Sequence, residues 1–328
     1  MECLSPKGSG TEKAREEMIG PAISVSQLKK AYKKNTVLTG VDFTVENGTI
    51  FALLGSNGAG KTTIINILTT LIKADGGNAI VGSFDVDKYP NKVREHISLT
   101  GQFAAVDDIL TARENLELIG DLRHVDDSQQ TAVDLLMKFN LTDAADRRIA
   151  TFSGGMRRRL DIAMSLIGSP AIIFLDEPTN GLDPQARNET WQTIRTLAKN
   201  GTTVFLTTQY LEEADELADI IAVLHHGRII AQGTASELKK LVPSGLVRFT
   251  FGDEQKLVTA IGVLENDYAI TDRDDLTITV ATGGSVTQIA ELFISLRDAK
   301  LEPTDFFQQS PTLDDVFFKL TSTATEEK

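Results

Sequence analysis

Three glycines, a lysine and two threonines interrupt an apolar stretch early in the chain. The string Gly55-Ser-Asn-Gly-Ala-Gly-Lys61-Thr62 has the spacing G-x-x-x-x-G-K-[ST]. Glycines let backbone N–H groups approach phosphate oxygens closely, and the helix that follows adds partial positive charge. Lys61 can neutralise phosphate charge and the Thr62 hydroxyl can ligate Mg²⁺, so the string predicts a phosphate-binding loop rather than a plain glycine-rich turn. The residues expected around the phosphates are Gly55, Ser56, Asn57, Gly58, Ala59, Gly60, Lys61, Thr62 and Thr63.

Two carboxylates end a fully apolar predicted strand at residues 171–178. Asp176 is placed to hold the Mg²⁺ shell, and Glu177 to polarise an attacking water. On its own, a strand that ends in Asp-Glu is more often a helix cap or a solvated edge. Together with the phosphate loop, the pair of carboxylates becomes a strong indication of a site that binds Mg²⁺ and activates water beside the phosphates.

A second candidate anion site lies in the segment TFSGGMRRRL, residues 151–160. Ser153 can cap the following helix, while Gly154 and Gly155 leave its N–H groups open. The three arginines at 157–159 are interpreted as charges on the surface of that helix, and the alternative is a contact with a membrane or a partner.

The order of these motifs resembles the ATP-binding subunit of ABC transporters over roughly residues 22–242. The matching pieces are the phosphate loop, TGQ with Gln102, FSGGM, IIFLDEP and GLDP at 181–184. The resemblance implies that Tyr32 stacks on adenine, that Gln102 contacts Mg²⁺ or the attacking water, and that Asp183 crosses a dimer interface. The alternatives are a surface tyrosine, a turn glutamine and an aspartate that only caps the next helix.

The same resemblance implies how the protein assembles. Two copies would meet head to tail, with each ATP between the Lys61 loop of one chain and the Ser153 helix of the other. One set of motifs predicts a homodimer, unless the chain pairs with a different ATPase subunit. The apolar stretches fall short of the roughly 20 residues that a membrane span needs. A separate permease is therefore expected to hold the protein at the cytoplasmic face of the membrane.

Longer strings are similar to the daunorubicin-type multidrug-resistance branch of these ATPases: GQFAAVDDILTARENLELIG, LTTQYLEEAD and SPTLDDVFFKLT. This similarity implies export of a drug or another hydrophobic compound. Two departures from the general family pattern stand out. Phe152 and Met156 replace the usual Leu and Gln of the signature, and Gln209 replaces the switch histidine. Glutamine can donate and accept hydrogen bonds but cannot become a cation. His225 and His226 fall at a predicted hairpin turn and are interpreted as solvated.

Alternating strands and helices predict an α/β domain with a mostly parallel sheet, an antiparallel edge and a helical subdomain. Thr111-x-x-Glu114 is a capping box at the start of that subdomain. The expected elements are strands at 22–32 and within 35–55, a helix from Lys61, a helical stretch over 110–167, a strand at 171–178, a helix over 185–201, a strand at 202–209, a helix over 211–219 and a hairpin at 220–233.

The last 86 residues differ from the rest in charge, with 7 Lys and Arg against 15 Asp and Glu. We place a boundary at LVPSGL, residues 241–246. It gives a flexible leader over 1–21, an ABC ATP-binding domain over 22–242 and an acidic α+β accessory domain over 243–328. Its predicted βαββαβ order is that of a ferredoxin-like domain, which favours a role in regulation or subunit docking. The elements are strands at 246–251, 267–271, 275–280 and 303–308, and helices at 254–264 and 285–299.

Composition narrows the functional classes. A net charge of −13 argues against binding along a nucleic-acid backbone. The main alternative, a soluble ABC-like ATPase that acts on nucleic acid or chromosomes, would need a long coiled coil or tandem cassettes, and neither is found. A non-catalytic regulator is opposed by Lys61, Asp176 and Glu177. The single cysteine, Cys3, predicts no disulfides and fits a reducing compartment.

Overall fold

The computed structural model describes residues 20–102, 105–242, 245–264, 269–282, 285–309 and 311–326. Residues 1–19 of the predicted leader, and Cys3 among them, lie outside the described residues. The chain divides into two compact units, Met1–Thr234 and Ala235–Lys328.

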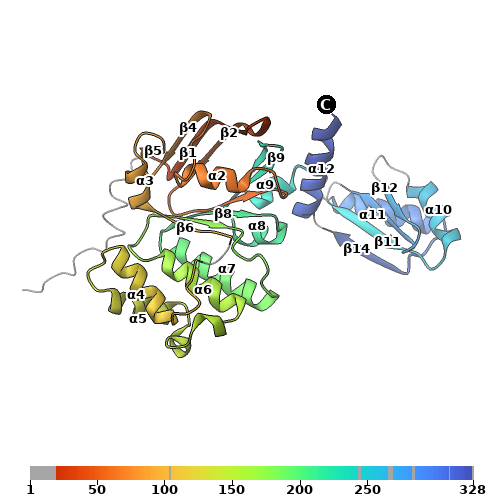
Figure 1. Ribbon diagram of the computed structural model, residues 1–328. Helices are drawn as coiled ribbons and strands as arrows, with labels where there is room; N and C mark the ends of the chain where they lie inside the picture. Colours follow the sequence, from red (N-terminus) through yellow and green to blue (C-terminus); the bar gives the residue numbers. More distant parts are fainter. Residues whose placement is uncertain are drawn as a thin grey trace, which may run out of the picture. The chain divides into compact units, whose positions relative to one another are not determined.

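A six-stranded sheet lies at the centre of the first unit (Figure 1), in the order β10-β9-β3-β8-β7-β6. The five strands β9, β3, β8, β7 and β6 pair with their neighbours in parallel, whereas β10 pairs antiparallel with β9. The prediction of a mostly parallel sheet with an antiparallel edge is therefore confirmed. The strands are β3 (Ile50–Leu54), β6 (Ile97–Thr100), β7 (Ile172–Asp176), β8 (Thr203–Thr208), β9 (Ile220–His225) and β10 (Arg228–Gly233).

A second, antiparallel sheet has the order β2-β1-β4-β5. The predicted strands β1 (Ile23–Tyr32) and β2 (Asn35–Val45) belong to this sheet. The sequence predicts neither β4 (Gly76–Val81) nor β5 (Phe84–Asp85), and β6 was missed as well. β4 reads GGNAIV, and its two glycines and asparagine hide the alternation that marks a strand.

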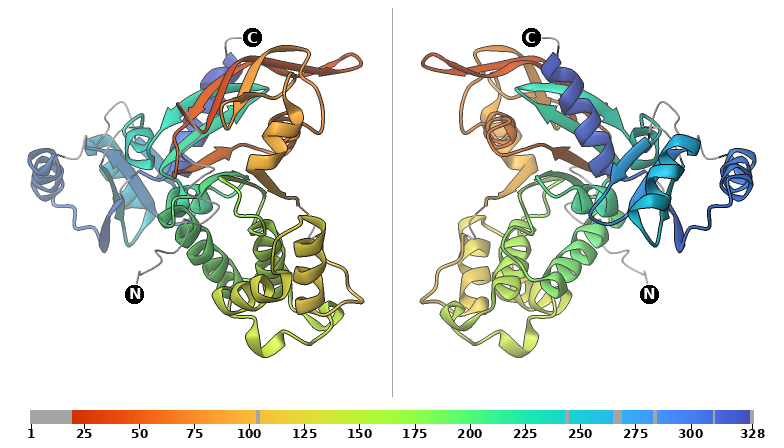
Figure 2. Two further views of the ribbon diagram at one scale, coloured as in Figure 1. Left: turned by 90° about the vertical axis from the view of Figure 1, so that its left-hand side faces the viewer. Right: turned by 90° about the vertical axis from the view of Figure 1, so that its right-hand side faces the viewer.

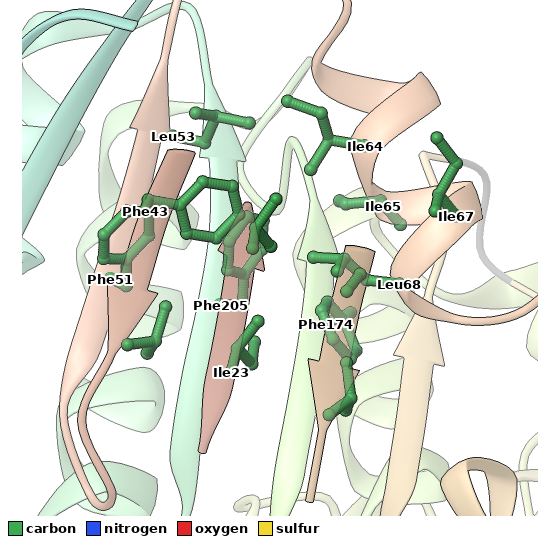
Figure 3. Close-up of a cluster of buried hydrophobic side chains, with 14 of the residues drawn as sticks. Ile23, Phe43, Phe51, Leu53, Ile64, Ile65, Ile67, Leu68, Phe174 and Phe205 are labelled. Atoms are coloured by element: carbon green, nitrogen blue, oxygen red, sulfur yellow. The ribbon is translucent and has the colours of Figure 1, made fainter. Parts of the chain in front are cut away.

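One hydrophobic core joins the two sheets around helix α2, Lys61–Leu68 (Figure 3). Phe51 of β3 stacks on Phe43 of β2 with ring centroids 5.2 Å apart, and on Phe205 of β8 at 5.4 Å. Fully burying a side chain of this size is worth about 1.5–3 kcal/mol relative to leaving it exposed. The helix contributes Ile64, Ile65, Ile67 and Leu68, all buried. This packing fixes the start of α2 against the end of β3.

The helices from α4 (Ala112–Leu122) to α7 (Pro184–Lys199) lie on the other side of the parallel sheet from the antiparallel strands, whereas α2 and α3 (Pro90–His96) lie on the same side as those strands (Figures 1 and 2). The predicted capping box is confirmed, because Thr111 Oγ1 accepts from Glu114 N–H and Glu114 Oε2 accepts from Thr111 N–H. Within the described part of the chain, none of the helices could cross a bilayer. The helices are α3 (Pro90–His96), α4 (Ala112–Leu122), α5 (Ser128–Lys138), α6 (Gly154–Ser165), α7 (Pro184–Lys199) and α8 (Leu211–Leu217), with 3₁₀ turns at Thr142–Ala144 and Ile149–Thr151.

The second unit contains an antiparallel sheet in the order β12-β13-β11-β14, and its elements follow the predicted βαββαβ sequence. In β11 the side chains of Val247 and Phe249 are buried and Arg248 between them is exposed. The buried face packs on the helices through one core. The elements are β11 (Leu246–Thr250), α10 (Glu254–Leu264), β12 (Ala269–Asp272), β13 (Thr277–Ala281), α11 (Val286–Asp298) and β14 (Asp305–Gln309).

The division between the units falls before helix α9, Ala235–Lys239, and not at residue 243 as composition indicates. The physical reason is that α9 contacts helix α12, Leu313–Glu326, which belongs to the second unit. Lys319 Nζ also donates to Leu241 O at 2.7 Å. Helix α12 itself was missed in the sequence.

Candidate active site

The phosphate loop connects β3 to α2, and its glycines are required at two points. A Cβ on Gly55 would lie 2.6 Å from the carbonyl oxygen of Leu224 in β9, so close strand packing excludes a side chain there. Gly60 caps α2 with φ of 113°, in the left-handed region that glycine tolerates. Ala59 is buried, and its N–H donates to Ser56 O at 3.2 Å. Its side chain therefore supports the loop from the core side.

Lys61 is almost fully buried at the first position of α2. Its Nζ donates to Gly55 O at 2.7 Å and to Ser56 O at 3.3 Å. The same ammonium lies 3.3 Å from Glu177 Oε1. The predicted phosphate-binding cation and the predicted catalytic carboxylate are thus in direct contact.

Asp176 is held by hydroxyl groups from two elements. Thr62 Oγ1 of α2 donates to Asp176 Oδ2 at 3.1 Å, and Thr207 Oγ1 of β8 donates to Asp176 Oδ1. A carboxylate beside a threonine hydroxyl, at the mouth of a phosphate loop, is a donor set suited to Mg²⁺, which prefers oxygen ligands and substrate phosphates. The residues present therefore fit this cation.

Glu177 has an uncommon backbone conformation for a non-glycine residue, with φ of 47°. Its N–H donates to Thr207 O at 3.1 Å, which holds the turn against β8. Gln102 Nε2 donates to Glu177 Oε2 at 3.4 Å and Asn180 Nδ2 at 3.2 Å. A strained backbone conformation persists only where surrounding contacts hold it, and such residues cluster at active sites.

Asn180 was missed in the sequence, and it extends the site further. Tyr210 donates its hydroxyl proton to Asn180 Oδ1 at 3.2 Å. A chain of hydrogen bonds therefore runs from Tyr210 through Asn180 to Glu177. Gln209 lies between Tyr210 and the end of β8. No sequence signal distinguishes Asn180 from an ordinary turn asparagine.

A cleft of about 510 Å³ lies beside the phosphate loop, and Lys61, Gln102 and Glu177 are among the residues that line it. Tyr32, the predicted adenine-stacking residue, is 46% exposed at the end of β1 and is available for stacking, although it does not line the cleft. Asn35 and Val37 of β2 do line it and were missed. The lining residues are Asn35, Val37, Ser56, Asn57, Gly58, Gly60, Lys61, Thr62, Thr63, Gln102 and Glu177.

Ser153 caps helix α6 as predicted, with its Oγ accepting from Met156 N–H at 3.3 Å. Gly154 is exposed, whereas Gly155 is buried against α7. A Cβ on Gly155 would lie 2.7 Å from Ala186 Cβ, which is too close for a side chain. The absent side chain of Gly155 therefore serves helix packing in addition to any anion contact. Ser153 is not among the residues that line the Lys61 cleft.

Comparisons with known proteins agree with this geometry. The family model described as "ABC transporter" matches residues 38–180. Daunorubicin resistance ATP-binding protein DrrA2 of Streptomyces coeruleorubidus is 44% identical over 94% of this chain and 98% of its own length. The chain belongs to the ABC transporter ATP-binding proteins. It is an ABC-type ATPase, and its P-loop fold and ATP hydrolysis follow from that membership.

Other relatives of this ABC ATPase carry related names. Doxorubicin resistance ATP-binding protein DrrA of Mycobacterium tuberculosis is 41% identical over 93% of this chain and 95% of its own length. Linearmycin resistance ATP-binding protein LnrL of Bacillus subtilis is 33% identical over 91% and 98%. A nucleotide-free ATP-binding cassette from an ABC transporter is similar in structure, with a TM-score of 0.61 and 26% identity over 67% of this chain and 94% of that chain.

Two further sequence predictions can be compared with the structure of this ABC ATPase. Asp183 is exposed and caps α7, with Oδ1 accepting from Ala186 N–H at 2.9 Å, which leaves a role at a dimer interface as a prediction. The interpretation of the three arginines as surface charges is wrong for Arg158, which is 6% exposed. Arg157 and Arg159 do form ion pairs near the surface, with Asp108 and Glu189.

A buried glutamate, Glu213 of α8, supports the turns around the site and was missed in the sequence. Its side chain is fully buried, and Oε1 accepts from Thr179 Oγ1 at 2.8 Å and from Trp191 Nε1 at 3.2 Å. Burial raises the pKa of Glu213, although the hydroxyls of Thr208 and Thr179 and the charge of Arg158 oppose this shift. Thr179 lies two residues after Glu177, beyond the end of β7, and Thr208 is the last residue of β8. Glu213 therefore connects the segments that follow these two strands.

Glu213→Gln is expected to stabilise the ABC ATPase at high pH. The raised pKa of Glu213 means that the folded protein holds this proton more tightly than the unfolded chain. Wild-type stability is therefore lost as the pH rises above the ordinary value of 4.5 and through the folded pKa, whereas an amide does not titrate. We expect the melting temperature of the variant to exceed that of wild type by about 2–4 °C at pH 8, or about 1 kcal/mol.

The difference should shrink as the pH falls toward 4.5. Scanning calorimetry at pH 5, 6.5 and 8 measures it, and Glu216→Gln on the same helix, an exposed position, is the matched control. A variant that is less stable than wild type at pH 8 would contradict the expectation.

Proposed function

We propose that this ABC ATPase powers the export of a drug, an antibiotic or another hydrophobic compound through a separate membrane permease. The observation that carries this proposal is the extent of the similarity to the daunorubicin resistance ATP-binding protein, which runs through both units of the chain. A cassette alone would support only a general transport role. The shared second unit supports the narrower, resistance-type function.

We propose separate roles for the residues of the candidate site in phosphate binding, water activation and Mg²⁺ binding, based on their contacts. Lys61 binds the β- and γ-phosphates of ATP, which compete with Glu177 for the ammonium. Glu177, once released, orients and polarises the attacking water, with Gln102 and Asn180 holding its second oxygen. Thr62 and Asp176 would hold Mg²⁺, which neutralises charge on the phosphates.

The complete site is proposed to form between two copies of the chain. Ser153 and the exposed Gly154 present the start of α6, whose free N–H groups and partial positive charge suit a phosphate. They would act on the nucleotide of the partner, and Asp183 would lie at the same interface. Gln209 would link the γ-phosphate to the water without contributing charge, and Tyr32 would stack on adenine.

The permease would place the protein at the cytoplasmic face of the membrane. For the acidic second unit, we propose a role in regulation or in docking to that partner, because it has no phosphate motif.

The test is export by cells that express this protein with a co-encoded hydrophobic protein of the permease type. We expect lower accumulation of daunorubicin with both proteins present, and no reduction when the ATPase carries Lys61→Ala. Equal accumulation with wild type and Lys61→Ala, in cells that contain both proteins at equal levels, would contradict export driven by this ATPase. A screen with macrolide and polyene antibiotics extends the same assay to other hydrophobic compounds.

A further inference from the structure

A buried arginine lies directly behind the catalytic carboxylate. Arg158 of α6 donates through Nε to Pro178 O at 2.8 Å, through Nη1 to Gly101 O at 2.7 Å and through Nη2 to Asp176 O at 3.2 Å. Nη1 also donates to Asp161 Oδ2 at 3.2 Å. One planar side chain therefore holds three backbone carbonyls from two separate segments.

The three carbonyls belong to residues that are adjacent in sequence to Gln102 and Glu177. Gly101 comes directly before Gln102, and Asp176 and Pro178 stand on either side of Glu177. The guanidinium thus fixes the backbone at both residues that meet at the proposed attacking water. Their side chains lie 3.4 Å apart, from Gln102 Nε2 to Glu177 Oε2.

We infer that Arg158 is a positioning residue for ATP hydrolysis, which fixes Gln102 and Glu177 relative to one another from behind the site. The inference rests on the proposed roles of these two residues and deepens them. Arg158 does not contact the cleft itself. Its effect is expected on the rate of the chemical step more than on ATP affinity.

The same contacts also connect two nucleotides in the proposed dimer. Helix α6 begins at Ser153, which would act on the nucleotide of the partner. Gln102 and Glu177 act on the nucleotide of their own chain. Arg158, five residues after Ser153 on α6, therefore ties the signature of one site to the catalytic carboxylate of the other.

A sound test must not leave a buried charge unpaired. Asp161 is 5% exposed and would lose its cationic partner in Arg158→Gln alone, which is strongly destabilising. The double variant Arg158→Gln/Asp161→Asn removes both charges, and the new asparagine can still accept from Ala105 N–H through Oδ1, as Asp161 does at 3.1 Å. Arg158→Lys is the second variant, since it keeps a charge opposite Asp161 but lacks the planar fork.

The experiment uses the purified full chain, with steady-state phosphate release and binding of a fluorescent ATP analogue. We expect kcat to fall about 10- to 100-fold in both variants, because small displacements of reacting groups have effects of that size. The Kd for the analogue should change less than about threefold on the same reasoning. Both variants should also accumulate an ATP-bound dimer in gel filtration, because binding continues while hydrolysis is slow.

The matched control is Lys92→Gln/Glu95→Gln, which removes an ion pair of 3.0 Å between two exposed side chains of α3, and its kcat should equal that of wild type. Wild-type kcat in both Arg158 variants would overturn the inference, and so would equal losses of kcat and ATP affinity without a dimer. Failure of the proposed export function would be seen separately, as a wild-type ATPase that does not reduce drug accumulation.

Discussion

Glu177→Gln is expected to abolish ATP hydrolysis while ATP still binds, so that ATP-bound dimers accumulate. The amide has nearly the volume of the carboxylate and can still accept hydrogen bonds from Gln102 and Asn180. A neutral amide cannot take a proton from water, and loss of a general base typically costs about 10²- to 10⁴-fold in rate. Removing this charge also removes the anion that lies 3.3 Å from Lys61, so the phosphates bind without a competitor.

Phosphate release and gel filtration with and without ATP measure both parts of this expectation. Glu95→Gln is the control, since Glu95 is an exposed glutamate paired with Lys92 on α3 and is not among the residues that line the cleft. Turnover near the wild-type rate in Glu177→Gln would show that another group activates the water. A variant that neither hydrolyses nor binds ATP would mean that Glu177 supports the loop rather than the chemistry.

The central part of the site could be predicted from the sequence because each piece is a contiguous pattern. The phosphate loop follows β3 and the carboxylates end β7, and both strands lie in one parallel sheet with β8 between them. Parallel strands bring their carboxyl ends to the same edge, which is where α/β sheets bind ligands. The contacts of Lys61 with Glu177 and of Thr62 with Asp176 follow from this topology.

The supporting residues could not be predicted, because only tertiary packing distinguishes them from surface groups. Arg158 is the middle one of three arginines, and nothing in that string indicates which of them faces inward. Helical geometry would turn one residue in three or four toward the core, but which arginine this is depends on how α6 packs against the elements around it. Glu213 sits in an acidic segment typical of a solvated helix and is fully buried against α7. Arg and Glu side chains are seldom fully buried, so the usual interpretation of such residues as surface charges is wrong for Arg158 and Glu213.

Gln209 is a different case, because the sequence shows its type but not its function. It follows β8 directly, and the neighbouring Tyr210 reaches Glu177 through Asn180. Two hydrogen bonds thus couple this segment to Glu177, the proposed catalytic carboxylate, and the comparison of Gln209 with the switch histidine does not include them. Its role as a switch stays a prediction.

Two inactive variants are expected to restore ATPase activity to each other when they are mixed. Lys61→Ala removes the cation of the phosphate loop, and Ser153→Arg places a bulky charge at the start of α6. If Ser153 acts across a two-fold dimer, a heterodimer of the two variants has both defects in one site and none in the other. Random exchange at equal concentrations then gives up to about a quarter of wild-type activity, because half of the dimers are mixed and each has one working site.

The alternative is that Ser153 serves the nucleotide of its own chain, and it predicts a different result from the same mixture. Every chain would then carry a damaged site, so no pairing could restore activity. Phosphate release is measured for each variant alone, for the mixture, and for a mixture of two differently tagged Lys61→Ala samples, which should stay inactive under either arrangement. An inactive mixture in which tag pull-down detects heterodimers would exclude action across the interface. The position of Ser153 outside the residues that line the Lys61 cleft favours recovery.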